Sequence, residues 1–165
     1  MLLSQNIHSK IFKDSESIKP TLAKWAEEGC KVVFTNGCFD ILHKGHVDYL
    51  FEASKLADKM VVGLNTDASV RSIKGDARPV NDNEARALIM AALGFVDMVV
   101  FFGEDTPKEL IDVVQPDVLT KGSDYEVKNI VGYDTVMAKG GEVITIDLTD
   151  GFSTTALIEK IKKAY

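Results

Sequence analysis

Two histidines three residues apart, His43 and His46, are the side chains of this sequence best placed to do chemistry. They follow an apolar run over residues 31–35 and precede an amphipathic helical pattern over residues 47–56. This order predicts a strand, a glycine-containing loop and a helix that begins at the second histidine. A helix N-terminus offers unpaired N–H groups and the positive end of a dipole, so both imidazoles are predicted to face one anion. Such fixed donors stabilise the charge that builds on an α-phosphate when a second phosphate attacks it.

Other uses of a histidine pair are weaker here. A histidine near a helix start is often a cap or a surface residue, but two of the three histidines in this chain fall in one four-residue window. Histidine is also a common metal ligand. No cluster of cysteine and histidine completes a zinc set in the sequence, so no metal site made by the protein is predicted.

The composition is that of an ordinary globular protein. A chain of 165 residues with 45% hydrophobic residues fits one domain, residues 1–165, with a real core. A net charge of −6 disfavours non-specific nucleic-acid binding, and no segment reaches the roughly 18 apolar residues that span a membrane. Residues 1–13 lack the apolar stretch of a secretory signal, and Cys30 and Cys38 flank one strand too far apart to pair. We therefore expect a cytoplasmic protein with free thiols.

Strands and helices alternate along the chain. The apolar runs cover residues 32–34, 60–64, 98–102, 117–119 and 143–146, and helical patterns cover residues 17–28, 47–56 and 126–139, with others starting at Asn81, near Thr106 and at Ser153. Glu84 follows Asn81 by three residues, as in a capping box. The alternation predicts an α/β fold, a three-layer α/β/α arrangement on a five-stranded parallel sheet. A helical extension over residues 1–29 is expected to precede a catalytic core over residues 30–165.

Polar residues follow four of these predicted strands. They are His43 and His46, then Asn65 and Asp67, then Lys121 and Asp124, and finally Ser153, Thr154 and Thr155. Ligands of parallel sheets bind beyond the carboxyl ends of the strands, so these groups are predicted to share one rim. Each has a simpler reading: Asn65, Asp67 or Ser153 alone could serve as a helix cap.

Two common nucleotide motifs are absent. No G-x-G-x-x-G follows the first predicted strand, and the sequence has no G-x-x-x-x-G-K-[ST], which disfavours dinucleotide redox chemistry and P-loop hydrolysis. Cys38 lies near a helix start, where a thiol can be activated, but no ordered set of cysteine, histidine and acid accompanies it.

Residues 37–46, which read GCFDILHKGH, resemble the signature of the nucleotidyltransferase superfamily that shares the H-x-G-H motif. The resemblance continues in order through Glu84-Ala85-Arg86 and Ser153-Thr154-Thr155, as in the cytidylyltransferase-like branch. More specifically, residues 30–161 resemble the adenylyltransferase domains of bacterial bifunctional heptose kinase/adenylyltransferases. The segments that carry this are residues 35–37, 64–69, 74–81, 104–107 and 150–155.

The resemblance implies a reaction of ATP with D-glycero-D-manno-heptose 1-phosphate that gives ADP-heptose and pyrophosphate by direct in-line attack. It implies catalytic roles for His43, His46 and Lys44, although Lys44 also reads as a solvated side chain. The implied nucleotide contacts are Asn36, Gly37, Cys38, Phe39, Gly45, Lys121, Ser153, Thr154 and Thr155. The implied substrate or phosphate contacts are Asp40, Asn65, Asp67, Lys74, Arg78, Arg86 and Asp124. Mg²⁺ is expected to be held by triphosphate oxygens and water.

Several alternatives stay open. Arg86 could instead pair with Glu84 or Asp82, and Asp40 is expected to shape its loop rather than bind metal. Cys38 stands where many superfamily members have a hydroxyl residue, and Ser123 stands where the heptose branch often has glycine. A cytidylyltransferase that forms a CDP-alcohol such as CDP-glycerol, or a non-catalytic nucleotide sensor, would use the same fold. Small-molecule substrates are expected, and the sequence leaves a homodimer open.

Overall fold

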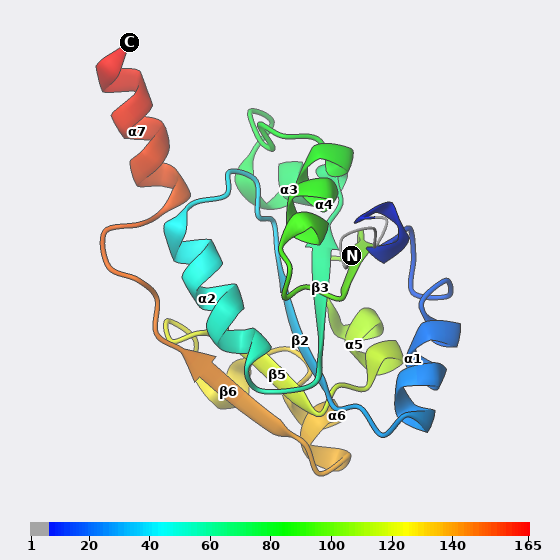
Figure 1. Cartoon of the computed structure of the whole chain (residues 1–165). Coiled ribbons are helices and arrows are strands. Elements are labelled where there is room, and N and C mark those ends of the chain that lie inside the picture. Colours follow the sequence, from blue (N-terminus) through cyan, green and yellow to red (C-terminus); the bar gives the residue numbers. More distant parts are fainter. Residues whose placement is uncertain (1–6) are drawn as a thin grey trace.

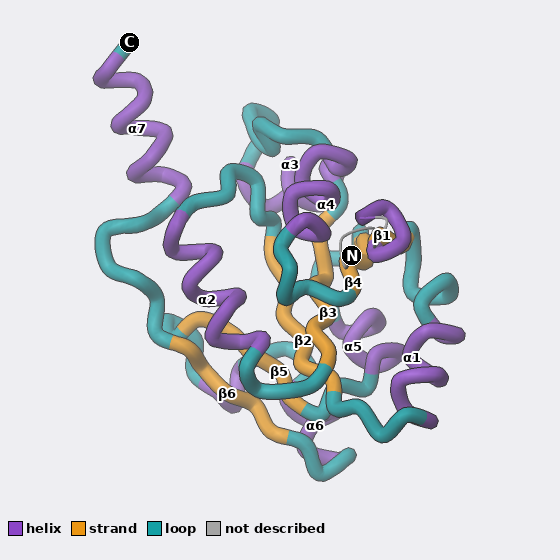
Figure 2. Tube along the Cα trace, in the orientation of Figure 1, coloured by secondary structure: helices purple, strands orange, loops and turns teal. Residues whose placement is uncertain are grey.

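The structure is a computed structural model that describes residues 7–165. Within this range six parallel strands form one sheet, in the order β1-β4-β3-β2-β5-β6 (Figures 1 and 2). The strands are β1 (Ile11–Phe12), β2 (Val32–Gly37), β3 (Lys59–Asn65), β4 (Met98–Phe102), β5 (Val118–Gly122) and β6 (Glu142–Ile146). The prediction of five strands is thus one short, because the two residues of β1 are too few to show a pattern. Residues 1–6 of the segment examined for a signal lie outside the described residues.

Helices cover both faces of the sheet, which confirms the three-layer α/β/α prediction (Figure 2). They are α1 (Lys19–Glu27), α2 (Lys44–Ser54), α3 (Asp67–Lys74), α4 (Asn83–Ala92), α5 (Lys108–Val114), α6 (Tyr133–Ala138) and α7 (Thr154–Ala164). Helices α2 and α4 pack on one face through Leu50 and Met90, and α1, α5 and α6 pack on the other. The two 3₁₀ segments are η1 (Ile7–Lys10) and η2 (Val127–Asn129).

Two predicted helices differ from those in the structure: one begins at another residue, and the other is divided in two. The capping box that starts at Asn81 is wrong: the N-cap of α4 is Asp82, whose carboxylate accepts a hydrogen bond from the Ala85 N–H at 2.9 Å. The helix predicted over residues 126–139 is interrupted at Gly132, which has a φ of +93° and lies against Ile111. Only η2 and the short α6 remain of it, because a left-handed residue ends an α-helical segment.

The strand order places a topological switch point beside the central strand β2. After β2 the chain moves outward through β3 and β4, and it then returns to β5 and β6 on the other side of β2. Loops that leave β2 and β5 therefore diverge at their carboxyl ends and open a crevice there.

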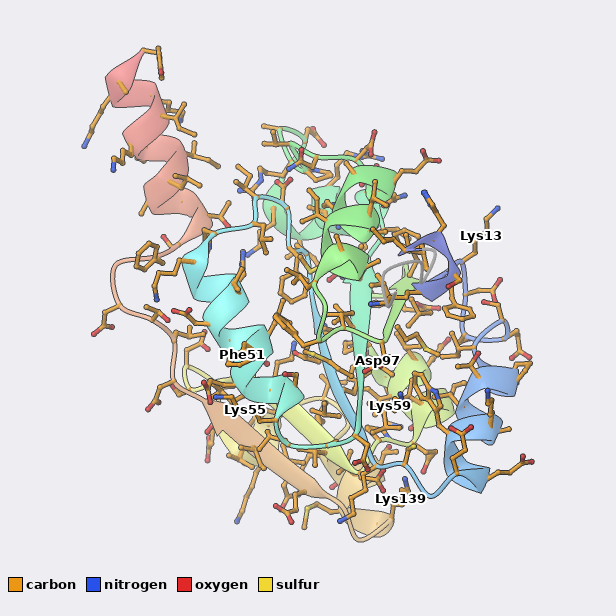
Figure 3. All side chains as sticks on the ribbon, in the orientation of Figure 1. Lys13, Phe51, Lys55, Lys59, Asp97 and Lys139 are labelled. Atoms are coloured by element: carbon orange, nitrogen blue, oxygen red, sulfur yellow. The ribbon has the colours of Figure 1, made fainter. Side chains whose placement is uncertain are left out.

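At the amino ends of the strands, opposite this crevice, aspartates accept hydrogen bonds from the first backbone N–H groups. Asp97 accepts a hydrogen bond from the Met60 N–H at 2.8 Å and lies near Lys59, and Asp117 accepts one from the Val32 N–H at 2.8 Å and pairs with Lys139. Figure 3 shows Asp97, Lys59 and Lys139 one below the other, from the middle to the bottom of the molecule and away from the start of α2. The carboxyl ends of the strands are therefore the place where a ligand can bind.

Candidate active site

A cavity of about 540 Å³ lies at the carboxyl ends of the strands. The predicted site residues that line it are Asn36, Gly37, Cys38, Phe39, Asp40, His43, Gly45, His46, Asn65, Lys74, Arg78, Lys121, Asp124, Ser153, Thr154 and Thr155. They come from the carboxyl ends of β2, β3 and β5 and from the segments that follow β2, β3, β5 and β6, so tertiary folding gathers segments that are far apart in the sequence. Three predicted residues, Lys44, Asp67 and Arg86, do not line it.

The histidine pair stands at the start of α2. His43 is the N-cap residue and His46 lies in the first helical turn, and their rings stack with centroids 3.8 Å apart. Gly45 makes this packing possible, because a Cβ added there would lie 3.2 Å from the His43 ring and 3.1 Å from the Cβ of Phe152. The two imidazoles and the helix N-terminus therefore face the same part of the cavity.

Both imidazoles are held in the neutral form. Burial, helped by the neighbouring His43, lowers the pKa of His46 to about 4, and burial also lowers the pKa of His43. The Nδ1 atoms of both rings are buried and have no hydrogen-bond partner among the described residues. A buried polar atom without a partner is costly, so these rings are arranged for a ligand that the cavity receives.

The neutral His46 gives a testable pH dependence of stability. An unfolded histidine titrates near about 6.5, whereas the pKa of folded His46 is about 4. Between these values the unfolded chain binds more protons, so the stability of the fold should decrease as the pH falls from 6.5 toward 4. We expect His46→Gln to lose less stability than wild type over this window, measured by urea unfolding at several pH values. Parallel pH curves for the two proteins would contradict a buried neutral His46.

A second helix N-terminus lies next to the first and also lines the cavity. Helix α7 begins beside the first turn of α2 (Figure 1), where Phe152 meets Gly45. Ser153 is its N-cap and accepts a hydrogen bond from the Ala156 N–H at 3.0 Å, while Thr154 and Thr155 supply hydroxyls in its first turn. Two convergent helix N-termini provide a strong electrostatic preference for an anion with several charges.

Asp40 fixes the loop that carries Arg78. Its carboxylate is buried, and it accepts hydrogen bonds from the Val80 N–H at 2.8 Å, from the Asn81 N–H at 2.9 Å and from Arg78. Burial opposes ionisation of Asp40, but these donors outweigh it and lower its pKa below the ordinary range. Asp40 thereby holds Arg78 at the cavity, where Lys74 at the end of α3 also lines it.

Burial shifts the pKa values of both Lys121 and Cys38. Burial lowers the pKa of Lys121 to about 8, and its Nζ donates to the backbone oxygen of Asn36 at 3.1 Å. Burial raises the pKa of the Cys38 thiol, which lies 3.9 Å from the Asn65 Oδ1. A thiol with a raised pKa is protonated at neutral pH and is a poor nucleophile.

Arg86 supports the site from behind instead of reaching into it. Its side chain is fully buried and donates to the backbone oxygen of Cys38 at 2.8 Å and to Asp67 Oδ1 at 2.7 Å. The partners that sequence suggested for Arg86, Glu84 and Asp82, are therefore wrong. The guanidinium is occupied by protein acceptors, and it ties the loop after β2 to α3 and α4.

Lys44 does not line the cavity, although its Nζ lies 5.6 Å from the ring centroid of Phe152, which does. Its side chain is 58% exposed and forms an ion pair with Asp48, four residues along α2. The helical spacing explains this contact, because residues i and i+4 lie on one face of a helix. This geometry is that of a solvated side chain, the alternative that the sequence left open for Lys44.

The cavity also includes residues that sequence analysis did not single out. Tyr49 bonds Thr35 at 2.8 Å and Thr120 at 3.2 Å, and so anchors α2 to the two central strands. Asp105 follows β4 on the same rim as the predicted residues, so the strand-end rule would have found it. The remaining lining residues are Ile73, Phe102, Pro107, Gly122, Tyr125, Leu148, Thr149 and Phe152.

Across residues 7–165, no three His, Cys, Asp or Glu side chains are grouped closely enough to hold a metal ion. None of the helices described is long and apolar enough to cross a bilayer.

Comparisons with known proteins agree on one family. The family model described as cytidylyltransferase-like matches residues 34–160. Proteins named "Bifunctional protein HldE" are 51% identical over 92% of this chain in Nitrobacter hamburgensis and 51% identical over 93% in Rhodopseudomonas palustris strain BisB5. The chain spans 31% of the length of each of these curated relatives.

Solved structures share the fold. A lipopolysaccharide core biosynthesis protein from Thermoplasma volcanium superposes with a TM-score of 0.64 and 29% identity, over 74% of this chain and all of that one. Pantoate-beta-alanine ligase from Francisella tularensis has a TM-score of 0.61 at 16% identity, over 92% of this chain and 76% of that one. The second similarity concerns the fold alone.

Proposed function

Since this chain belongs to the cytidylyltransferase-like family and is a nucleotidyltransferase, we propose that it transfers AMP from ATP to D-glycero-D-manno-heptose 1-phosphate, giving ADP-heptose and pyrophosphate. The observation that carries the proposal is the stacked, neutral pair His43 and His46, whose buried Nδ1 atoms lack partners at a helix N-terminus. The similarity to proteins named HldE and to a lipopolysaccharide core biosynthesis protein supports a sugar phosphate as the acceptor.

The proposed reaction is a direct displacement. An oxygen of the sugar phosphate forms a bond to the α-phosphorus of ATP, and the bond from that phosphorus to the β-phosphate bridging oxygen breaks. Pyrophosphate leaves with the electron pair, so no side-chain nucleophile is needed. Catalysis then consists of positioning and charge stabilisation. N–H groups of His43 and His46 would donate to the α-phosphate, and Thr154 and Thr155 would hold the β- and γ-phosphates at the start of α7.

The two ends of the cavity suit the two substrates. Lys74 and Arg78 add positive charge on the β3 side, which suits the phosphate of the acceptor. Lys121 in β5 and Asp124 just after β5 lie on the other side of β2 and suit the nucleotide. Because the described residues provide no cage for a metal, Mg²⁺ would be carried by the triphosphate, whose charge it would partly neutralise. ATP as a substrate places the proposed reaction in the cytoplasm.

The first turn of α7 should contribute to ATP binding. We expect Thr154→Ala combined with Thr155→Ala to weaken ATP binding by about tenfold, because two hydroxyls worth about 1 kcal/mol or less each leave the triphosphate. Calorimetric titration with ATP measures the effect. Ser153→Ala is the matched comparison, since its hydroxyl already caps the helix. Equal affinity in the double variant and wild type would mean that Thr154 and Thr155 serve only the helix.

Cys38 should be dispensable for the chemistry. We expect Cys38→Ser to keep turnover within about tenfold of wild type, because the attacking oxygen comes from the acceptor and a hydroxyl replaces a weak thiol donor. Steady-state turnover with ATP and the sugar phosphate measures this. A folded Cys38→Ser protein without turnover, or a nucleotidyl-cysteine adduct found by mass spectrometry, would contradict direct attack.

The experiment that tests the function is pyrophosphate release over the four nucleoside triphosphates and a set of sugar 1-phosphates. We expect the highest kcat/KM with ATP and heptose 1-phosphate. Preference for CTP with an alcohol phosphate such as glycerol 3-phosphate would identify a cytidylyltransferase. Tight nucleotide binding without turnover on any pair would identify a sensor.

A further inference from the structure

The cavity that holds the cationic side chains is also lined by carboxylates, which accept hydrogen bonds. Asp105 and Asp124 line it together with the cationic Lys74, Arg78 and Lys121. Carboxylates repel phosphates at short range, so neither aspartate suits a phosphate contact. None of the hydrogen bonds among the described residues ends at either carboxylate, although the charge of Lys121 acts on Asp124. Asp105 is exposed to the cavity and the solvent, so it can accept hydrogen bonds from a ligand that brings donors.

Asn36 provides a third acceptor, and this one is buried. Its Oδ1 has no hydrogen-bond partner within the described part of the chain, although its backbone oxygen is taken by Lys121. An amide oxygen shielded from water without a donor is unfavourable, so it is expected to gain one when the cavity fills. A hydroxyl or an amine is the chemistry that this atom requires.

The Asn36 side chain and the loop of Asp105 both lie toward α5. A Cβ added to Gly63 of β3 would lie 3.1 Å from the Cβ of Asn36 and 3.1 Å from the Leu110 side chain, so the Asn36 side chain is on the α5 face of the sheet. Asp105 is in the loop between β4 and α5, while Asp124 follows β5. Lys74 and Arg78 come from the chain between β3 and β4, so they lie on the same side of β2 as Asp105.

We propose that Asp105 and the side-chain oxygen of Asn36 form a polyol subsite that accepts hydrogen bonds from hydroxyls of the acceptor sugar. Phe102 and Pro107, which line the same part of the cavity, supply apolar surface for the C–H face of the ring. The phosphate of the acceptor then meets Lys74 and Arg78, and its hydroxyls meet acceptors that a bare phosphate or an aliphatic acid cannot use. This inference rests on the proposed function and adds the residues that select a polyhydroxylated acceptor.

The test measures which substrate loses affinity when Asp105 is changed. We expect Asp105→Asn and Asp105→Ala to raise KM for the sugar 1-phosphate by tenfold or more, on the scale of a lost charge-assisted hydrogen bond, and to leave KM for ATP within about twofold. Glu104→Gln is the matched control: it removes the adjacent carboxylate, which lines a separate small pocket. Asp105 is exposed, so its variants are expected to fold, which thermal unfolding checks.

Deoxy sugars make the assignment specific. On a panel of monodeoxy mannose 1-phosphates, loss of the hydroxyl that meets Asp105 should reduce kcat/KM about tenfold in wild type and hardly at all in Asp105→Ala, as in a double-mutant cycle. Identical deoxy profiles in the two proteins would overturn the subsite. A rise in KM for ATP alone, or a shifted Mg²⁺ requirement alone, would also overturn it.

A binding measurement separates failure of the subsite from failure of the proposed function. If wild type shows no turnover with any nucleotide and sugar phosphate, the proposed function fails. Calorimetric titration of mannose 1-phosphate then decides the subsite by itself: at least tenfold weaker binding to Asp105→Asn than to Glu104→Gln supports it, and equal or absent binding overturns it.

Discussion

His46→Ala should fold as wild type does and lose about 10²–10³-fold in kcat, the scale of one missing transition-state donor. The imidazole is fixed by stacking on His43 at 3.8 Å and by an edge contact with Phe39 at 5.3 Å, so it is held in position before substrate arrives. A donor that needs no reorganisation contributes most when charge develops on the α-phosphate. Because the pKa of His46 is about 4, it should donate as a neutral imidazole at physiological pH.

Single-turnover kinetics at saturating ATP and acceptor, together with circular dichroism of the variant, measure this effect. His8→Ala is the control, since His8 lies in η1 and does not line the cavity. Turnover of a folded His46→Ala protein within threefold of wild type would remove the histidine pair from the chemistry.

Arg86→Ala should lower the free energy of unfolding by about 3–5 kcal/mol, the range for breaking a buried ion pair by removing one partner. The guanidinium has no exposed surface and donates to Cys38, Asp67 and Asn83 at 2.7–2.9 Å. Its removal leaves the backbone oxygen of Cys38, before the histidines, and the carboxylate of Asp67, at the start of α3, without these donors. Lysine cannot replace a planar fork with several donors, so Arg86→Lys should recover little of the stability.

Urea unfolding at pH 7 measures the change, with Arg71→Ala as a control because Arg71 is exposed on α3. We expect Arg71→Ala to stay within about 0.5 kcal/mol of wild type, as is usual at the surface. A loss below 1 kcal/mol in Arg86→Ala would mean that the buried network contributes little and that Arg86 is free for another role.

The local patterns of the sequence were sufficient for the fold class. Short β-branched and aromatic runs that alternate with amphipathic stretches predict a parallel sheet covered by helices, because each apolar face must be buried. The pattern failed where it is too short or interrupted, as at β1, which has two residues, and at Gly132, which breaks a predicted helix. The division at residue 30 into an extension and a core remains a prediction.

The sequence by itself determined that His43, His46 and the serine and threonine residues at 153–155 stand at helix starts, because capping and helical periodicity are local. The tertiary structure alone decided which side chains face the ligand. Lys44 and Arg86 are as polar as Lys74 and Arg78, yet Lys44 turns to Asp48 and Arg86 is used by the loop it supports. Burial, pKa values and free hydrogen-bonding capacity depend on neighbours brought together from distant strands. For this reason the unpaired Oδ1 of Asn36 and the place of Asp105 in the cavity became visible only in the folded chain.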